Sequence, residues 1–366
     1  MTSIVERKAE HLEFAADAAA EVTRGAGWED VDLVHEALPE LDRDEIDLRT
    51  GLLGRTLGAP LVIAAMTGGH PGAMEINAVL ARAAERHGLA IGAGSQRAAL
   101  RDPALEPSYR VIREQAPTAP VYANIGAAQL IAQGERPPLS DDDVRHVVDM
   151  IGADALAIHL NVLEESVQPE GDAASRGCAS AIERIAALLD VPVIVKETGA
   201  GMSRATARRL AALGVGALDV GGCGGTSFAI IERLRAERQG DRRGVALGTA
   251  LAEWGIPTAV AIAGAAAAGL PIIGTGGVRS GSDAAKALAL GATAVGVARP
   301  LLLAAMDGDD AVDTWIERFL SELRTVLLLS GCRGPQQLRD RPLVVHGRTR
   351  DWLADLGYSR AREEAG

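Results

Sequence analysis

The chain has 366 residues and a net charge of −12, and apolar side chains make up 48% of it although aromatic ones reach only 3%. Its length suits one large α/β domain or two ordinary ones, and its core must be aliphatic. The acidic balance and the lack of a basic block argue against a surface that binds nucleic acid.

The sequence carries no sign of a membrane or of an oxidising compartment. Its N-terminus lacks the apolar core of a signal peptide, and no apolar run reaches the length of about 18 residues that a membrane span requires. Three cysteines, Cys178, Cys223 and Cys332, are too few and too widely spaced for a disulfide framework or a zinc site. We therefore expect a cytoplasmic protein without membrane insertion.

After a charged, helix-prone stretch at residues 1–50, apolar segments of strand length recur. Each ends near Gly, Ser, Thr or Asn, and each is followed by a pattern typical of an amphipathic helix, of which Ser282–Gly291 is the clearest. The eight predicted strand segments are 60–69, 89–97, 121–126, 155–161, 191–199, 217–225, 270–278 and 294–300.

Apolar strands that alternate with helices indicate a parallel sheet covered on both faces. Eight such units over about 250 residues favour a closed (β/α)8 barrel, although periodicity alone leaves an open doubly wound sheet as the alternative. We expect a single domain, 1–366, with an N-terminal extension (1–50), a barrel (58–325) and a C-terminal helical tail (326–366) that is charged from about Arg360. The long connection 226–269, between the sixth and seventh strands, is typical of a lid or an oligomer contact.

Polar residues gather where these strands end, which is where barrels of this kind carry their chemistry. His159 and Asn161 are two apart on the fourth strand and therefore share a face, and Glu164 and Glu165 follow them. Lys196 ends an apolar run and must face a charge or an electron-rich ring. The other strand ends carry Met66-Thr67-Gly68-Gly69, Gly94-Ser95-Gln96-Arg97, Asn124, Gly221 to Ser227, Thr275 to Arg279, and Ala298-Arg299.

The last two strand ends predict a phosphate site. Barrels often bind a phosphate between the loops after strands seven and eight, against a helix N-terminus. Gly276-Gly277 and Ala298-Arg299 would supply backbone N–H groups there. A ring attached to that phosphate would lie near Lys196, an arrangement that suits FMN with its electron-rich N1/O2 edge towards the lysine.

With these motifs in place, almost the whole chain resembles the type 2, FMN-dependent isopentenyl diphosphate isomerases. The resemblance rests on the strand-end motifs above and on Arg7-Lys8 with His11, His159-Leu160-Asn161, Pro169 to Asp172, Val195-Lys196-Glu197 and Asp219 to Thr226. It implies that reduced FMN acts at N5 as acid and base, without net redox change, and converts isopentenyl to dimethylallyl diphosphate. It also implies NADPH as reductant, Mg²⁺, and a homo-oligomer, either a tetramer or an octamer.

The resemblance implies roles for individual residues. It assigns Mg²⁺ to Glu165, and we expect catalytic roles for Glu164, His159 and Lys196. The prenyl diphosphate would be bound by Arg7, Lys8, Ser95, Gln96, Arg97, His159 and Asn161. FMN would be bound by Met66, Thr67, Gly68, Ser95, Asn124, Lys196, Thr226, Gly277, Arg279, Ala298 and Arg299. Read alone, His11 is a solvent or helix-surface histidine, and Glu170 and Asp172 are either solvated loop charges or metal ligands.

Glu164 departs from the family pattern, which has Gln at this position. A carboxylate beside Glu165, a diphosphate and a reduced flavin should have a raised pKa, so Glu164 could serve as a general acid or base, which an amide cannot. Three functions follow: the isomerase with Glu164 in proton transfer, a relative that isomerises or cyclises a different or longer prenyl substrate, or a flavin- and diphosphate-binding protein without turnover.

Overall fold

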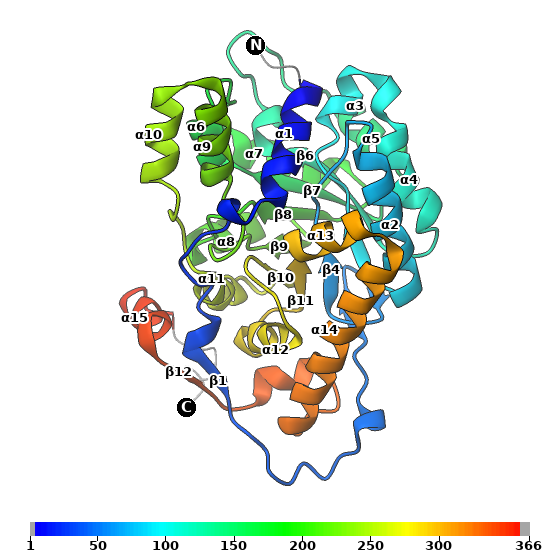
Figure 1. The fold of residues 1–366 in the computed structure, drawn as a ribbon, viewed down its shortest axis with the longest axis vertical. Coiled ribbons are helices and arrows are strands. Elements are labelled where there is room, and N and C mark those ends of the chain that lie inside the picture. Colours follow the sequence, from blue (N-terminus) through cyan, green and yellow to red (C-terminus); the bar gives the residue numbers. More distant parts are fainter. Residues whose placement is uncertain (1–3, 359–366) are drawn as a thin grey trace.

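The computed structural model describes residues 4–358 and contains a closed barrel of eight parallel strands (Figure 1). The strands are β4 (Leu61–Ile63), β5 (Ala90–Gly92), β6 (Val121–Gly126), β7 (Ala155–Leu160), β8 (Val193–Glu197), β9 (Ala217–Asp219), β10 (Ile272–Thr275) and β11 (Ala294–Val297). They pair in chain order, and β11 pairs with β4 through Val62 and Gly296, which closes the ring. The predicted barrel and its eight strands are confirmed, and the open sheet is excluded.

Helices surround the barrel. They are α2 (Ala73–His87), α3 (Arg97–Arg101), α4 (Pro107–Gln115), α5 (Asp141–Met150), α6 (Val162–Val167), α7 (Cys178–Leu188), α8 (Arg204–Ala211), α11 (Thr258–Ala265), α12 (Gly281–Leu290), α13 (Arg299–Asp307) and α14 (Asp309–Leu329). The helix predicted at Ser282–Gly291 is α12. The Ser280 hydroxyl caps it by accepting the Asp283 N–H at 3.1 Å, and Gly291 ends it at φ 120°.

The inside of the barrel is filled at the amino ends of the strands. All eight strands contribute to one buried cluster, which contains mostly small or aliphatic side chains. A hairpin of β2 (Thr50–Leu52) and β3 (Arg55–Leu57) covers this end and inserts Leu52 and Leu57 into the cluster. The carboxyl ends of the strands are therefore the end at which the barrel can open to a ligand.

The N-terminal segment is less helical than its composition suggested. Helix α1 spans only Ile4–Ala16 and lies beside α9 at the carboxyl ends of the strands (Figure 1). Further on, β1 (Val31–Leu33) pairs antiparallel with β12 (Leu343–Val345) and joins the two ends of the chain. The tail from residue 326 starts inside α14 and contains β12 and α15 (Gly347–Asp355). The charged end predicted from Arg360 lies outside the described residues.

The connection 226–269 folds into α9 (Phe228–Gln239), α10 (Arg242–Ala250) and α11. In Figure 1, α9 and α10 stand together beside α6, above the barrel. Within residues 4–358, no helix is both long and apolar enough to cross a membrane.

Candidate active site

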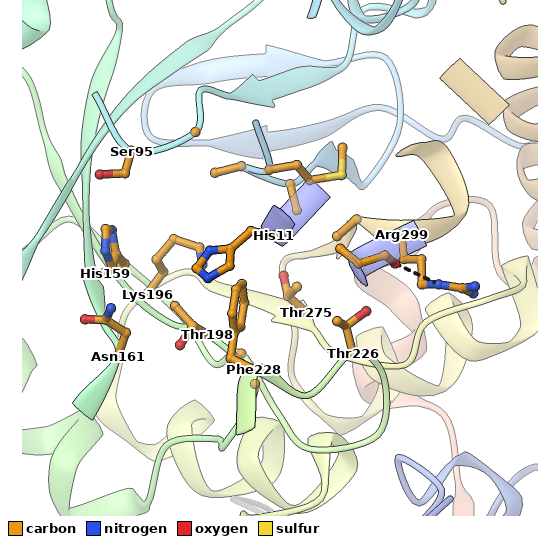
Figure 2. Close-up of a pocket in the computed structure, with 18 of the residues that line it drawn as sticks. His11, Ser95, His159, Asn161, Lys196, Thr198, Thr226, Phe228, Thr275 and Arg299 are labelled. Atoms are coloured by element: carbon orange, nitrogen blue, oxygen red, sulfur yellow. Dashed lines mark hydrogen bonds between the residues drawn. The ribbon is translucent and has the colours of Figure 1, made fainter. Parts of the chain in front are cut away.

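A pocket opens at the carboxyl ends of the strands, with α1 and the start of α9 on its rim (Figure 2). It brings together nearly all the residues singled out in the sequence. These are Arg7, Lys8, Met66, Thr67, Gly68, Ser95, Arg97, Asn124, His159, Asn161, Glu164, Glu165, Lys196, Thr226, Gly277, Arg279, Ala298 and Arg299. The strands place these side chains together because the carboxyl ends of parallel strands meet at one end of a barrel.

Gln96 is the exception, because its side chain does not line the pocket. Its side chain is fully buried behind the strands, where Nε2 donates to the Val147 carbonyl at 2.9 Å and Oε1 accepts the Asn124 N–H at 3.0 Å. The neighbours Ser95 and Arg97 line the pocket instead. Gln96 therefore joins β6 to α5 and supports the site from behind.

His159 is held in one tautomer. The Asn124 amide donates to the Ala93 carbonyl at 3.0 Å, so its oxygen is left to accept from His159 Nδ1 at 2.9 Å. Nδ1 therefore carries the proton, and Nε2 carries the lone pair. Burial, followed by the charges of Lys196, Lys8 and Arg97, lowers the pKa of His159 to about 3. The imidazole is thus uncharged at neutral pH and adds no positive charge to the site.

Asn161 follows β7 directly, at the start of α6, and joins two carboxylates. Its Nδ2 donates to Glu164 Oε2 and to Glu165 Oε1, both at 3.0 Å. Burial raises the pKa of Glu164 to about 7, and Glu232 and Glu165 add to the rise, which His11 opposes. The direction of this pKa shift agrees with the prediction, but burial is its largest cause, ahead of the neighbouring negative charges that the prediction named.

The loop after α6 fixes Arg97. Asp172 is buried and pairs with Arg97 Nη1 at 2.6 Å and with Arg136, while its N–H donates to Glu165 Oε2 at 2.6 Å. Glu170 pairs with Arg235 Nη2 at 3.0 Å. Both acidic residues thus form ion pairs with arginines, so neither is a simple solvated charge.

Lys8 joins α1 to the first two strand ends. Its ammonium donates to the Gly68 carbonyl (2.8 Å), the Ser95 carbonyl (2.7 Å) and the Tyr109 hydroxyl (2.9 Å). These bonds use all three of its protons. Burial, together with the charge of Arg7, lowers its pKa to about 7. Lys8 would have to exchange one of these partners to bind a diphosphate directly.

At the predicted phosphate site, the backbone fits better than the side chains. Gly276 and Gly277 have φ of 119° and 67°, and a Cβ on either would lie within 2.2 Å of a neighbouring carbonyl oxygen. Helix α13 begins at Arg299 next to them, and the N–H groups of Ala298 and Arg299 precede the first bonds of this helix end, which run from Leu301 and Leu302 to the Ala298 carbonyl. Close backbone approach and a helix N-terminus are the features that bind phosphates.

The two arginines of this region already have partners. Arg299 donates to the carbonyls of Ala15 and Ala16, both at 3.0 Å, and to Glu21 at 3.1 Å. Arg279 donates to the same carboxylate of Glu21 at 2.5 Å. Their side chains therefore hold the N-terminal segment over the barrel.

Lys196 lies near the end of β8, close to a buried carboxylate. It is in register with Asp219 of β9, and its Nζ donates to the Glu197 carbonyl at 3.1 Å. Burial raises the pKa of Asp219, and the charge of Lys196 opposes the rise. The ammonium also lines the pocket, where it can contact a ligand.

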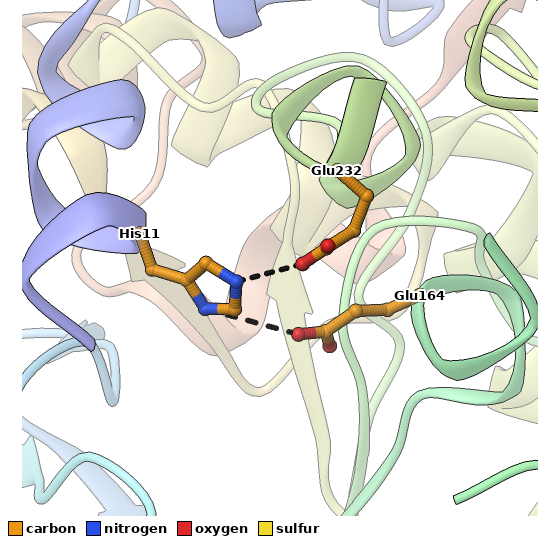
Figure 3. Close-up of side chains that lie close together, drawn as sticks. All are labelled: His11, Glu164 and Glu232. Carbon is orange, nitrogen blue, oxygen red and sulfur yellow. Dashed lines mark hydrogen bonds and ion pairs between the residues drawn. The ribbon is translucent and has the colours of Figure 1, made fainter. Parts of the chain in front are cut away.

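The interpretation of His11 as a surface residue is wrong. His11 lines the pocket, and its Nε2 lies 2.7 Å from Glu232 Oε1 (Figure 3). Its ring also meets Phe228 edge-on, with the ring centroids 6.0 Å apart. The helical spacing of Arg7, Lys8 and His11 offered a signal, since residues three and four apart lie on one face of a helix.

Glu232 belongs to a buried group of charges. Arg235 is 2% exposed and bonds to Glu232 (2.6 Å), Glu10 (2.9 Å) and Glu170 (3.0 Å). We call these four residues the Arg235 cluster. It joins α1, α9 and the loop after α6, three segments far apart in sequence. Sequence reasoning missed it because each member reads alone as a surface charge.

Comparison with known proteins fits this geometry. Residues 143–345 match the family model described as FMN-dependent dehydrogenase. The isopentenyl-diphosphate delta-isomerase of Methanosarcina barkeri is 48% identical over 354 residues, which cover 96% of this chain and 95% of that protein. The protein of the same name from Halobacterium salinarum is 48% identical over 354 residues and 96% of each chain.

The chain belongs to the isopentenyl-diphosphate delta-isomerase family. Among solved structures, mandelate oxidase with (S)-2-phenylpropionate has a TM-score of 0.61 at 23% identity, covering 92% of this chain and 94% of that one. A second mandelate oxidase structure has a TM-score of 0.61 at 22% identity, covering 93% and 95% of the chains. At this identity the similarity is one of fold, so the chain shares its barrel architecture with mandelate oxidase.

Proposed function

We propose that this protein interconverts isopentenyl and dimethylallyl diphosphates with the help of reduced FMN and Mg²⁺. The strongest support is that a relative of that name matches nearly the whole chain, while the pocket collects the residues that the reaction needs. NADPH is the proposed source of reducing equivalents. We also propose a cytoplasmic homo-oligomer, a tetramer or octamer, in which residues 1–366 act as one domain.

The residues present fit FMN. Gly68 has φ 154°, and a Cβ there would lie 2.1 Å from Tyr109 Cε1, so only glycine leaves the backbone free at this wall. Gly277, Ala298 and Arg299 would bind the phosphate through backbone N–H groups, while Thr67, Asn124 and Lys196 would face the ring. When bound and reduced, FMN would supply acid and base chemistry to the alkene and Lys196 would offset negative charge on the ring.

The substrate diphosphate would lie beside Arg7, Arg97 and Asn161. Asp172 holds Arg97 from behind, which leaves the rest of the guanidinium for phosphate oxygens. Glu165 would hold Mg²⁺, since this ion prefers one or two carboxylates together with phosphate oxygens. His159 Nε2 would face the site with a lone pair and could only accept a hydrogen bond, because its other nitrogen donates to Asn124.

Glu164 would hold and release a proton next to the alkene. Its carboxyl lines the pocket, and Asn161 fixes one of its oxygens. A carboxyl group with a pKa near 7 can serve as either acid or base at neutral pH, whereas the amide found at this position in the family pattern cannot.

The test is anaerobic incubation of the protein with FMN, NADPH, Mg²⁺ and isopentenyl diphosphate. We expect dimethylallyl diphosphate as the product, and its absence while FMN is bound and reduced would refute the proposal. Glu164→Gln should lower kcat by about 100-fold, at the lower end of what general acid–base catalysis contributes. A gain of isomerase activity in this variant would instead mean that Glu164 directs the wild-type enzyme to another substrate.

A further inference from the structure

Three side chains from distant parts of the chain meet at one edge of the pocket. They are His11 of α1, Glu164 of α6 and Glu232 of α9 (Figure 3). The two ring nitrogens of His11 face different carboxylates: Nε2 lies 2.7 Å from Glu232 Oε1, and Nδ1 lies 4.0 Å from Glu164 Oε1. The imidazole therefore stands between a carboxyl group inside the pocket and one buried outside it.

The surroundings fix which atoms face the ring. Arg235 Nη1 donates to Glu232 Oε2 at 2.6 Å, so the other oxygen of that carboxylate is left to accept the His11 Nε2–H. Asn161 holds Glu164 Oε2 in the same way and leaves Oε1 towards His11 Nδ1. The Arg235 cluster thus sets the ring orientation, and the ring in turn presents Nδ1 to Glu164.

A metal ion at this trio would need other geometry. Ligand atoms around a zinc-type ion lie about 2.0–2.2 Å from it, so a single ring nitrogen would have to face both carboxylates. Here the two nitrogens face one carboxylate each, and the guanidinium of Arg235 already compensates the charge of Glu232. Hydrogen bonding through the imidazole is the arrangement that the contacts favour.

We propose that His11 is a positioning residue for Glu164: its Nδ1 directs the carboxyl group of Glu164 at the substrate, while Glu232 and Arg235 hold the ring. This inference rests on the proposed isomerase function. The gap of 4.0 Å exceeds a hydrogen bond by about 1 Å, and contacts of this kind commonly tighten once substrate is bound.

A double-mutant cycle tests the proposal. In His11→Gln the amide reaches the place of Nε2 and keeps the bond to Glu232, but nothing replaces Nδ1. We expect kcat of the holoenzyme to fall about tenfold with KM for isopentenyl diphosphate nearly unchanged, and the same change to have less than about a twofold effect in the Glu164→Gln background. A merely structural role of His11 would give the same loss in both backgrounds, and that result overturns the proposal.

The matched control is Glu13→Gln. Glu13 also joins α1 to α9, through Arg238, but the pair is exposed and lies away from Glu164. We expect its kcat to stay within about twofold of wild type, since exposed pairs contribute little. An equal loss in this variant would attribute the effect of His11→Gln to loosening of α1, against the proposal.

Elemental analysis distinguishes this hydrogen-bonded arrangement from a metal site at His11, Glu164 and Glu232. Wild type and His11→Gln are dialysed against Mn²⁺ or Zn²⁺, and then against buffer. We expect no retained ion that depends on His11, and one equivalent per chain in wild type alone would replace this proposal by a metal site. Absence of turnover in the wild-type holoenzyme would overturn the proposed function and this inference with it, whereas turnover with equal losses in both backgrounds overturns this inference alone.

Discussion

Replacing Arg235 by Met tests whether the Arg235 cluster behaves as a buried ion network. Methionine keeps the length and apolar contacts of the side chain but removes the guanidinium. Among residues 4–358, Glu232, which is 1% exposed, would then keep only His11 as a hydrogen-bond partner, whereas Glu10 and Glu170 reach solvent. Burial alone would lower the pKa of Arg235, but its carboxylate partners, with Glu232 the strongest, raise that pKa by more. The wild-type guanidinium is therefore charged.

The expected cost follows from that burial. Removing one partner of a buried ion pair costs about 3–5 kcal/mol, because it leaves a charge without compensation. Arg238→Met provides the matched control on the same helix. Arg238 pairs with Glu13 on the surface, where the side chains are 44% and 60% exposed, and it lies 4.4 Å from the Phe14 ring centroid. Its loss should cost about 1 kcal/mol.

The assay is thermal and urea unfolding of both variants, followed by circular dichroism at one fixed FMN concentration, because a bound ligand shifts apparent stability. We expect the midpoint of Arg235→Met to fall by about 4–6 °C and that of Arg238→Met by about 1 °C. Adding Glu232→Gln to Arg235→Met should recover part of the loss, since the uncompensated charge is gone. Equal losses in the two single variants would refute the ion-network argument.

Three further predictions concern the pocket. The pKa of His159 is about 3 in the folded state but about 6.5 in the unfolded state, so the free energy of unfolding should fall by about 1.4 kcal/mol per pH unit below pH about 6.5. His159→Asn keeps the bond to Asn124 and should lose less stability between pH about 6.5 and about 5.5, as measured by urea unfolding. Gly68→Ala should weaken FMN binding about tenfold or more in a fluorescence titration, whereas Gly51→Ala, which meets no atom within 4 Å, should not. Glu165→Gln should raise the Mg²⁺ concentration for half-maximal turnover about tenfold or more, and an unchanged value would remove Glu165 from the metal site.

The sequence predicted the eight strand–helix units and most of the pocket, whereas closure of the sheet became visible in the pairing of β11 with β4. The pattern of an apolar strand followed by an amphipathic helix repeats eight times. Polar or glycine residues at the end of such a strand lie at the carboxyl end of the barrel, whatever the details of side-chain packing. For that reason, the sequence alone was enough to predict pocket positions for His159, Asn161, Lys196 and the glycines after strand seven. The spacing of a strand also predicted that His159 and Asn161 would lie together.

The hydrogen-bond and ion-pair partners of these groups depend on how distant segments pack together. Gln96 is next to two pocket residues in sequence, yet its side chain turns to the Val147 carbonyl because the chain enters α3 there. The tautomer of His159 depends on a hydrogen bond from Asn124 to Ala93, and its neutral state depends on burial and on Lys196, Lys8 and Arg97, none of which a motif encodes. Charge and tautomer depend on burial and on neighbours from other strands, and these are set by packing.

The same holds for α1. Its sequence reads as a charged surface helix, and its role comes from contacts with residues more than 200 positions away, such as His11 with Glu232 and Arg235 with Glu10. Pairs at that separation leave no periodic trace in a single sequence. Glu164 could be recognised as unusual from its motif, but its partner His11 became visible only once α1, α6 and α9 were placed around one pocket.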